Sequence, residues 1–420
     1  MIEWYDWFVY STFSVYFAAA FFPDGDATSQ LLHTAGIFAV GFFMRPVGGW
    51  LLGRLGDRKG RKAALNVTVM LMSLSALLIA VVPTHAQIGN WAAAVLLLAR
   101  MLQGMSVGGE YAASATYLSE AAPPGRRGFF CSFQMVSMKV GQLIGLSLQI
   151  LLQQTMSQET LSSWGWRIPF IIGALGAAAV FYLRRSLVET EAFEKAVEES
   201  GQEEERGTLR GLWEYRRTVA LVVAFSMGGT LADYTYSTYM TKYLSNSAGL
   251  SRTDASLVSF VAILVFICVQ PLAGGLSDRI GRRPLLITFG LSAMLFTVPL
   301  MTALGHVSTF GSALLLMIAG LLIITGYTSM SALVKTELFP ARIRSLGVAL
   351  PYALANALFG GTAEYVALWF KDAGVESGFF WYVTACAAVS LTVYLTMRET
   401  KDVSFSQPQA PAAAAADVTA

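Results

Sequence analysis

Charged side chains are scarce in this sequence. Lys, Arg, Asp and Glu together make up 13% of the 420 residues, whereas a soluble globular protein carries about 25%. Hydrophobic residues make up 55%. This balance excludes an ordinary soluble domain and predicts an all-α membrane protein, in which whole helix surfaces can face an apolar solvent.

Cysteine and histidine are also rare, with three residues of each. Cys131, Cys268 and Cys386 are far apart and lie within apolar runs, so we expect buried free thiols rather than a disulfide or a metal site. The histidines do not cluster and show no metal-ligand spacing. We therefore expect neither a metal nor a catalytic cluster, and we do not predict an enzyme.

Two further absences restrict the class of protein. No basic tract that could bind nucleic acid is present, and the formal net charge is only +2. The phosphate-binding pattern Gly-x-x-x-x-Gly-Lys-Ser/Thr is missing, which argues against ATP as an energy source. We expect no cofactor.

What the sequence does contain is a series of apolar runs of about 20 residues, the length that spans a bilayer. Most runs are joined by short connections, and residues 185–217 separate them into two groups of six. The predicted spans are 4–22, 34–54, 63–82, 91–117, 128–152, 166–184, 218–243, 253–276, 284–303, 310–335, 345–370 and 377–397. This predicts bundles at 1–184 and 218–402, a cytoplasmic linker at 185–217 and a disordered tail at 403–420.

The basic residues orient these spans. If the N-terminus is cytoplasmic, the segments on that side hold 21 of the 29 Lys and Arg residues. Cytoplasmic loops of membrane proteins carry such an excess. We therefore predict that both termini are cytoplasmic.

The two groups of spans repeat the same loop motif. Asp-Arg-x-Gly-Arg follows the second span at Asp57 and again the eighth span at Asp278. A second repeated pattern pairs Glu120 and Arg127 with Glu337 and Arg344. We expect these charges to form a conformational latch with helix N-termini or arginines of the other half. The expected latch residues are Asp57, Arg58, Arg61, Glu110, Glu120, Arg127, Asp278, Arg279, Arg282, Glu337 and Arg344.

The duplicated motif resembles the signature of the major facilitator superfamily. Further stretches look like its metabolite:proton symporter branch: Glu3–Asp6, Met44–Trp50, Arg100–Tyr111 and Trp164–Phe170. Within that branch, Phe359–Leu368 and Phe379–Thr384 look most like α-ketoglutarate and related dicarboxylate permeases. The resemblance implies a 12-helix fold with a central cavity, alternating access, uptake driven by protons, and the bacterial inner membrane. We expect a monomer. It also implies a cytoplasmic segment before Glu3, so we expect this start to be either wrongly assigned or truncated.

Ionisable residues within spans are costly and therefore mark functional sites. Arg45, Arg100 and Lys139 against Asp233 leave a surplus of positive charge, which suits an organic anion, and guanidinium groups pair well with carboxylates. Structural roles remain open for Arg45 and Lys139. The predicted substrate-binding residues are Arg45, Arg100, Lys139, Gln103, Tyr327, Tyr352 and Asn356.

Asp6 and Arg100 resemble the first-helix aspartate and fourth-helix arginine of proton-coupled sugar porters. That resemblance implies a carboxyl group that carries the coupling proton and an arginine that favours its ionised form; a static ion pair is the alternative. Asp233 joins the predicted proton-coupling residues. Lys139 and Asp233 depart from the permease pattern, in which both positions are apolar. They either form a salt bridge between the halves or change the specificity toward a substrate that carries an amine as well as a carboxylate. Citrate, shikimate, proline and betaine remain alternative substrates, and a transporter-like sensor is a remote alternative.

Overall fold

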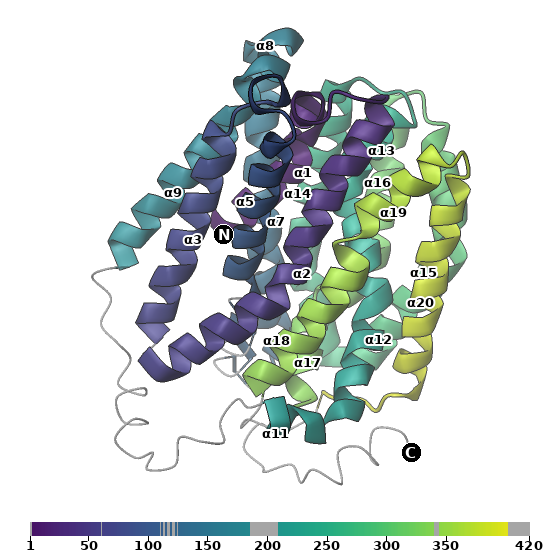
Figure 1. The fold of residues 1–420 in the computed structure, drawn as a ribbon. Helices are drawn as coiled ribbons and strands as arrows, with labels where there is room; N and C mark the ends of the chain where they lie inside the picture. Colours follow the sequence, from purple (N-terminus) through teal and green to yellow (C-terminus); the bar gives the residue numbers. More distant parts are fainter. Residues whose placement is uncertain are drawn as a thin grey trace.

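The computed structural model describes residues 2–59, 61–109, 111, 114–115, 118–119, 122–123, 125–184, 209–339 and 344–401, and all regular structure in these ranges is helical. The helices of the first half are α1 (Ile2–Phe21), α2 (Ala27–Lys59), α3 (Arg61–Val81), α4 (His85–Ile88), α5 (Trp91–Gly108), α7 (Arg127–Thr155), α8 (Gln158–Ser163), the 3₁₀ turn η1 (Gly165–Arg167) and α9 (Ile168–Arg184). They run side by side along one axis (Figure 1).

The second half begins with the short helix α11 (Leu209–Glu214). Its remaining elements are α12 (Arg216–Asp233), η2 (Tyr234–Tyr239), α13 (Met240–Asn246), α14 (Arg252–Ile280), α15 (Arg282–Gly305), α16 (Phe310–Thr328), α17 (Ser331–Glu337), α18 (Arg344–Ala355), η3 (Asn356–Gly360), α19 (Ala363–Asp372) and α20 (Ser377–Thr396). The segments η2 and η3 are π-helical and each interrupts one spanning helix.

Ten helical stretches of the described residues are long and apolar enough to cross a membrane, so the chain is a multi-pass membrane protein. Four of these stretches are composite, because η1–α9, α12–η2–α13, α16–α17 and α18–η3–α19 each form one span. Helices α1 and α3 occupy the positions of the first and third predicted spans. The twelve predicted spans are therefore each represented by helix.

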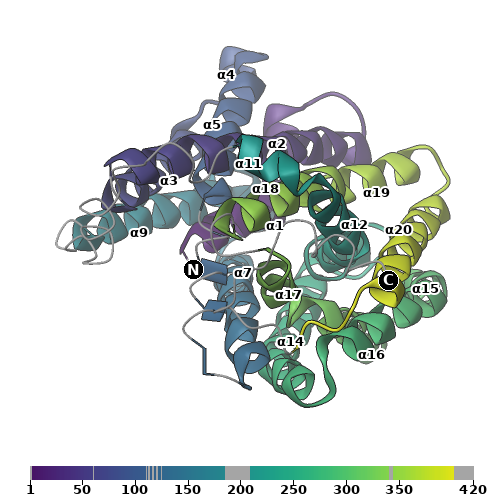
Figure 2. The same ribbon diagram turned by 90° about the horizontal axis from the view of Figure 1, so that it is seen from below.

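The two groups of helices meet along two seams, which Figure 2 shows in a view along the bundle. On one side α7 packs against α14, and on the other α2 packs against α18 and α19. Glycines permit the first contact, since a Cβ on Gly128 would meet the carbonyl oxygen of Gly274, and the reverse also holds. Small residues allow this close approach of membrane helices.

The centre of the bundle is closed in this conformation. Asp6, Arg100 and Lys139 are all 0% exposed. Two cavities lined by described residues of both halves each have room for about one water. One cysteine departs from expectation: Cys131 and Cys386 are buried, but Cys268 is exposed on the outer surface of α14.

Candidate functional site

Helices α2 and α5 pack backbone to backbone, and this contact places two arginines at the centre. A Cβ on Gly104 would overlap the backbone of Gly41, and a Cβ on Gly108 would overlap the backbone of Arg45. Only glycine permits so close an approach at these positions. The side chains of Arg45 and Arg100 consequently lie near each other, both beside Trp7 of α1.

Arg45 and Arg100 share one aromatic partner. The guanidinium carbon of Arg45 is 4.1 Å from the Trp7 ring centroid, and that of Arg100 is 4.2 Å from it. Phe42 also lies 4.1 Å from Arg45, and Tyr10 lies 4.4 Å from Arg100. These cation–π contacts hold both groups in a dry site.

Neither guanidinium forms an ion pair with a carboxylate of the described residues. Arg100 donates from Nη1 to Gln103, while its Nε and Nη2 are buried without a partner among the described residues. The Nε and Nη2 of Arg45 likewise have no partner in the part of the chain that the structure describes. Both groups thus keep hydrogen-bond donors that an incoming carboxylate could accept from.

Asp6 is separate from Arg100 in this conformation. Both of its carboxyl oxygens are buried, and neither has a hydrogen-bond partner among the described residues. The group lies against α9, where a Cβ on Gly173 would overlap it. The anticipated Asp6–Arg100 pair is therefore not formed here, because Arg100 is held by aromatic rings and Gln103 instead.

Lys139 and Asp233 do form a salt bridge between the halves, with 2.8 Å between Nζ and Oδ1. Lys139 also donates to the Ser237 hydroxyl at 2.7 Å, and Gln142 donates to the Ser237 carbonyl at 2.7 Å. The π-helical segment η2 places Ser237 one turn after Asp233. Because this lysine already has a carboxylate, it is less available to an anionic substrate than Arg45.

A second buried ion pair was not anticipated from the sequence. Lys242, next to the end of the predicted span 218–243, is 3% exposed and pairs with Glu364 of α19. Ser11 of α1 donates to Glu364 at 2.7 Å and accepts from Lys242 at 3.2 Å. These three side chains connect the halves away from Asp278.

Lys335 is a further buried cation that the sequence did not reveal. It is 0% exposed in α17, and its Nζ donates to the Tyr111 hydroxyl at 3.0 Å. It counted as the last residue of a predicted span, yet the apolar helix continues to Glu337. That continuation is the signal that could have identified it.

The remaining predicted substrate residues are buried at different places. Tyr352 stacks on Tyr111 with 3.9 Å between ring centroids. The hydroxyl of Tyr327 and the side-chain amide of Asn356 are buried without hydrogen-bond partners among the described residues. Tyr327 lies inside the second half, packed between Phe225 and Phe289.

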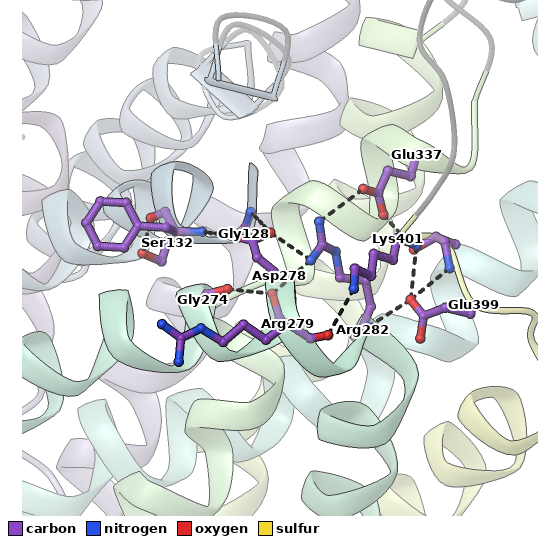
Figure 3. A network of polar contacts seen from close by, with 12 residues as sticks. Gly128, Ser132, Gly274, Asp278, Arg279, Arg282, Glu337, Glu399 and Lys401 are labelled. Carbon is purple, nitrogen blue, oxygen red and sulfur yellow. Dashed lines mark hydrogen bonds and ion pairs between the residues drawn. The ribbon is translucent and has the colours of Figure 1, made fainter. Parts of the chain in front are cut away.

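The expected latch is partly present, at the end of the bundle that carries Asp278 (Figure 3). The Asp278 carboxylate accepts from the backbone N–H groups of Gly128 and Phe129 at 2.8 and 2.9 Å. These are at the N-terminus of α7, in the other half, where a carboxylate is stabilised by the helix dipole. Arg282 donates to Asp278 at 2.9 Å and approaches Glu337 at 3.7 Å.

Other predicted latch residues lie around this cluster, and some lie outside the residues that the structure describes. Arg344 donates to the carbonyls of Thr336 and Phe339, Arg279 is exposed, and Arg127 begins α7. Glu399 accepts from the backbone of Arg282 and Arg283. Glu110 and Glu120, together with the side chains of Asp57, Arg58 and Arg61, lie outside the described residues.

This arrangement provides two kinds of chemistry. Buried arginines with unused donors can bind an organic anion, and a buried carboxyl group can bind a proton. Ion pairs and backbone hydrogen bonds between the halves can form in one conformation and break in another.

Comparison with known proteins agrees with the geometry. The chain is 50% identical to the alpha-ketoglutarate permease of Escherichia coli K12 over 397 residues, covering 94% of this chain and 91% of the relative. It is 36% identical to a citrate-proton symporter of Salmonella typhi, covering 92% and 89% of the two chains. The crystal structure of a D-xylose-proton symporter superposes with a TM-score of 0.72 at 19% identity, covering 96% of each chain.

The profile of one family extends over most of the helices described above. It is described as Major Facilitator Superfamily and matches residues 2–363. The fold, the permease relatives and this match agree with one another. The chain belongs to the Major Facilitator Superfamily.

Proposed function

We propose that the chain is a proton-coupled symporter that imports a small dicarboxylate, such as α-ketoglutarate, by alternating access. The observation that carries this proposal is that the guanidinium groups of Arg45 and Arg100 are buried and have no carboxylate partner among the residues that the structure describes. A buried charge is costly unless it is paired. A substrate carboxylate would complete these sites by accepting from the unused donors. The 50% identical permease supports α-ketoglutarate as the first substrate to test.

Asp6 is the proposed proton carrier. A carboxyl group buried without donors or cations is more stable as the neutral acid, whereas a nearby guanidinium stabilises the ionised form. A movement of α1 that brings Asp6 to Arg100 would release the proton. Substrate and Asp6 would then compete for the same arginine, which links proton and anion transport.

The proposed transport cycle breaks the two sets of contacts between the halves in turn. Opening at the Asp278 end must separate its carboxylate from Gly128 and Phe129. Opening at the other end must separate Ser11 from Glu364 and Lys242. The proposed setting is the bacterial inner membrane with both termini cytoplasmic.

The test of this function is uptake of radiolabelled α-ketoglutarate into proteoliposomes, with and without an inward-directed proton gradient. We expect gradient-stimulated accumulation that a protonophore abolishes. Absence of uptake by folded protein would contradict the proposal. Citrate is the second candidate, because a 36% identical relative is a citrate-proton symporter. Competition by unlabelled citrate in the same vesicles distinguishes the two substrates.

The Asp6→Asn variant tests the coupling role. We expect loss of accumulation against a gradient with retention of α-ketoglutarate exchange, because exchange needs binding and alternating access but no net proton movement. Thermal unfolding in detergent checks that the variant is folded. If the variant still concentrates substrate when a proton gradient is imposed, Asp6 is not the proton carrier.

A further inference from the structure

Lys335 differs from the other two buried lysines at the interface between the halves. Lys139 pairs with Asp233, and Lys242 pairs with Glu364. In the part of the chain that the structure describes, Lys335 has no carboxylate partner, although it is 0% exposed within a membrane span. A lysine in this position is costly, so an ionisable group there marks a functional site.

The partners that Lys335 does have are two tyrosines. Its Nζ is 3.8 Å from the Tyr352 ring centroid and 5.1 Å from that of Tyr111. Among the described residues, its one hydrogen bond goes to the Tyr111 hydroxyl at 3.0 Å. An ammonium group has three donors, so two donors remain for another acceptor. The aromatic faces stabilise a cation without neutralising it.

The tyrosine pair connects Lys335 to Arg45. Tyr111 belongs to the first half and Tyr352 to the second, and their rings stack with 3.9 Å between centroids. The same two rings line a small cavity together with Arg45. Arg45 and Lys335 therefore lie on neighbouring sides of one tyrosine pair, in different halves of the molecule.

We propose that Lys335 is a specificity-determining substrate contact that binds one carboxylate of the dicarboxylate, while the other carboxylate binds at Arg45, beside Arg100 on the Trp7 ring. This inference rests on the proposed function and names its second anion-binding group. The substrate carboxylate takes the two free ammonium donors of Lys335. Because one cation comes from each half, a dicarboxylate joins the halves in a way that a monocarboxylate cannot.

Two analogues of α-ketoglutarate test the assignment, since each replaces one carboxylate by a methyl group. They are 2-oxopentanoate, which keeps the carboxylate beside the ketone, and 4-oxopentanoate, which keeps the other one. Binding of all three ligands is measured by equilibrium dialysis on purified full-length wild type, Lys335→Met and Arg45→Met. Each lost carboxylate contact should reduce affinity about 10- to 100-fold, as expected for a charge-assisted hydrogen bond.

The expected result is a complementary pattern. Lys335→Met should bind α-ketoglutarate about 10- to 100-fold more weakly than the wild type does. Its affinity for α-ketoglutarate should still exceed its affinity for one of the two analogues, but not for the other. In Arg45→Met, α-ketoglutarate keeps its advantage over the other analogue. Lys335→Arg, which preserves the charge, should keep both advantages. Lys371→Met is the matched control, because this lysine donates to the Asn246 carbonyl and the Ser247 hydroxyl and does not line the cavity of Arg45, Tyr111 and Tyr352.

Three outcomes would overturn the assignment of Lys335. These are unchanged α-ketoglutarate affinity in a folded Lys335→Met protein, equal loss for all three ligands, and loss of proton dependence without a change in ligand preference. Failure of the wild type to bind any dicarboxylate would instead contradict the proposed function. Lys335→Met should unfold at or above the wild-type temperature, since it removes an unpaired buried charge.

Discussion

Two sets of buried cations lie at the interface between the halves, and they differ in what surrounds them. Lys139 and Lys242 each face a carboxylate from the second half. Arg45, Arg100 and Lys335 face aromatic rings instead. The paired lysines satisfy their charge within the protein, so their first effect is on how the halves hold together. The ring-bound cations keep unused donors, so their first effect is on what the protein binds.

The largest expected effect is on stability, from the paired set. Lys242→Met leaves the Glu364 carboxylate buried without a cation, which typically costs about 3–5 kcal/mol. We expect a lower thermal unfolding temperature in detergent. The double variant Lys242→Met/Glu364→Gln should recover most of the loss, because it removes both charges. A single variant as stable as the wild type would show that this pair is not satisfied as an ion pair.

The next effect is on binding, from the ring-bound set. Arg45→Met should weaken substrate binding by about 1.5–3 kcal/mol without lowering the unfolding temperature. Calorimetric titration and thermal unfolding of the same sample separate the two effects. Arg252→Met is the matched control, because this guanidinium also lies over a ring, that of Tyr16 at 5.3 Å, but is exposed. If Arg45→Met loses stability as well as affinity, the ring-bound cations do not differ from the paired lysines in their effect on stability.

The smallest effect is on the balance of conformations. Asp278→Asn replaces the charged acceptor for the Gly128 and Phe129 N–H groups, and we expect a shift of about 1–2 kcal/mol toward opening at that end. Electron–electron distances between spin labels at Arg126→Cys and Ile280→Cys, in a Cys268→Ser background, measure this shift.

Glu399→Gln is the control for that experiment. Glu399 accepts hydrogen bonds only within the second half, from the backbone of Arg282 and Arg283 and from its own neighbours. It should leave the label distances unchanged. Equal distances in wild type and Asp278→Asn would mean that the carboxylate does not hold the halves together.

The sequence was sufficient for the helices and for contacts that depend on local motifs. Span length predicted the twelve helices. The duplicated loop predicted that Asp278 meets helix N-termini or arginines of the other half, and the structure shows the first of these. Lys139 and Asp233 stood out because both are charged at mid-span. In each case the signal lies within a few residues of sequence.

Contacts that depend on helix packing were harder to predict. Lys242 and Lys335 fell at the ends of the predicted spans 218–243 and 310–335, so they did not stand out as mid-span charges. They are buried because helices from both halves cover them, which no single span can reveal. Asp6 and Arg100 lie in the predicted helices, but their positions depend on packing. Arg100 lies on the Trp7 ring, whereas the Asp6 carboxyl group lies against Gly173 of α9.

The glycine contact between α7 and α14 also sets the mechanics of any opening. Gly128 lies in the first turn of α7, a helix of 29 residues, which is about 43 Å long at 1.5 Å per residue. With the backbones touching at that point, a tilt of about 15° would move the far end of α7 by roughly 11 Å while Gly128 stays almost still. The crossing thus acts as a pivot: opening the far end leaves the Asp278 hydrogen bonds intact, whereas opening the near end requires a new pivot elsewhere.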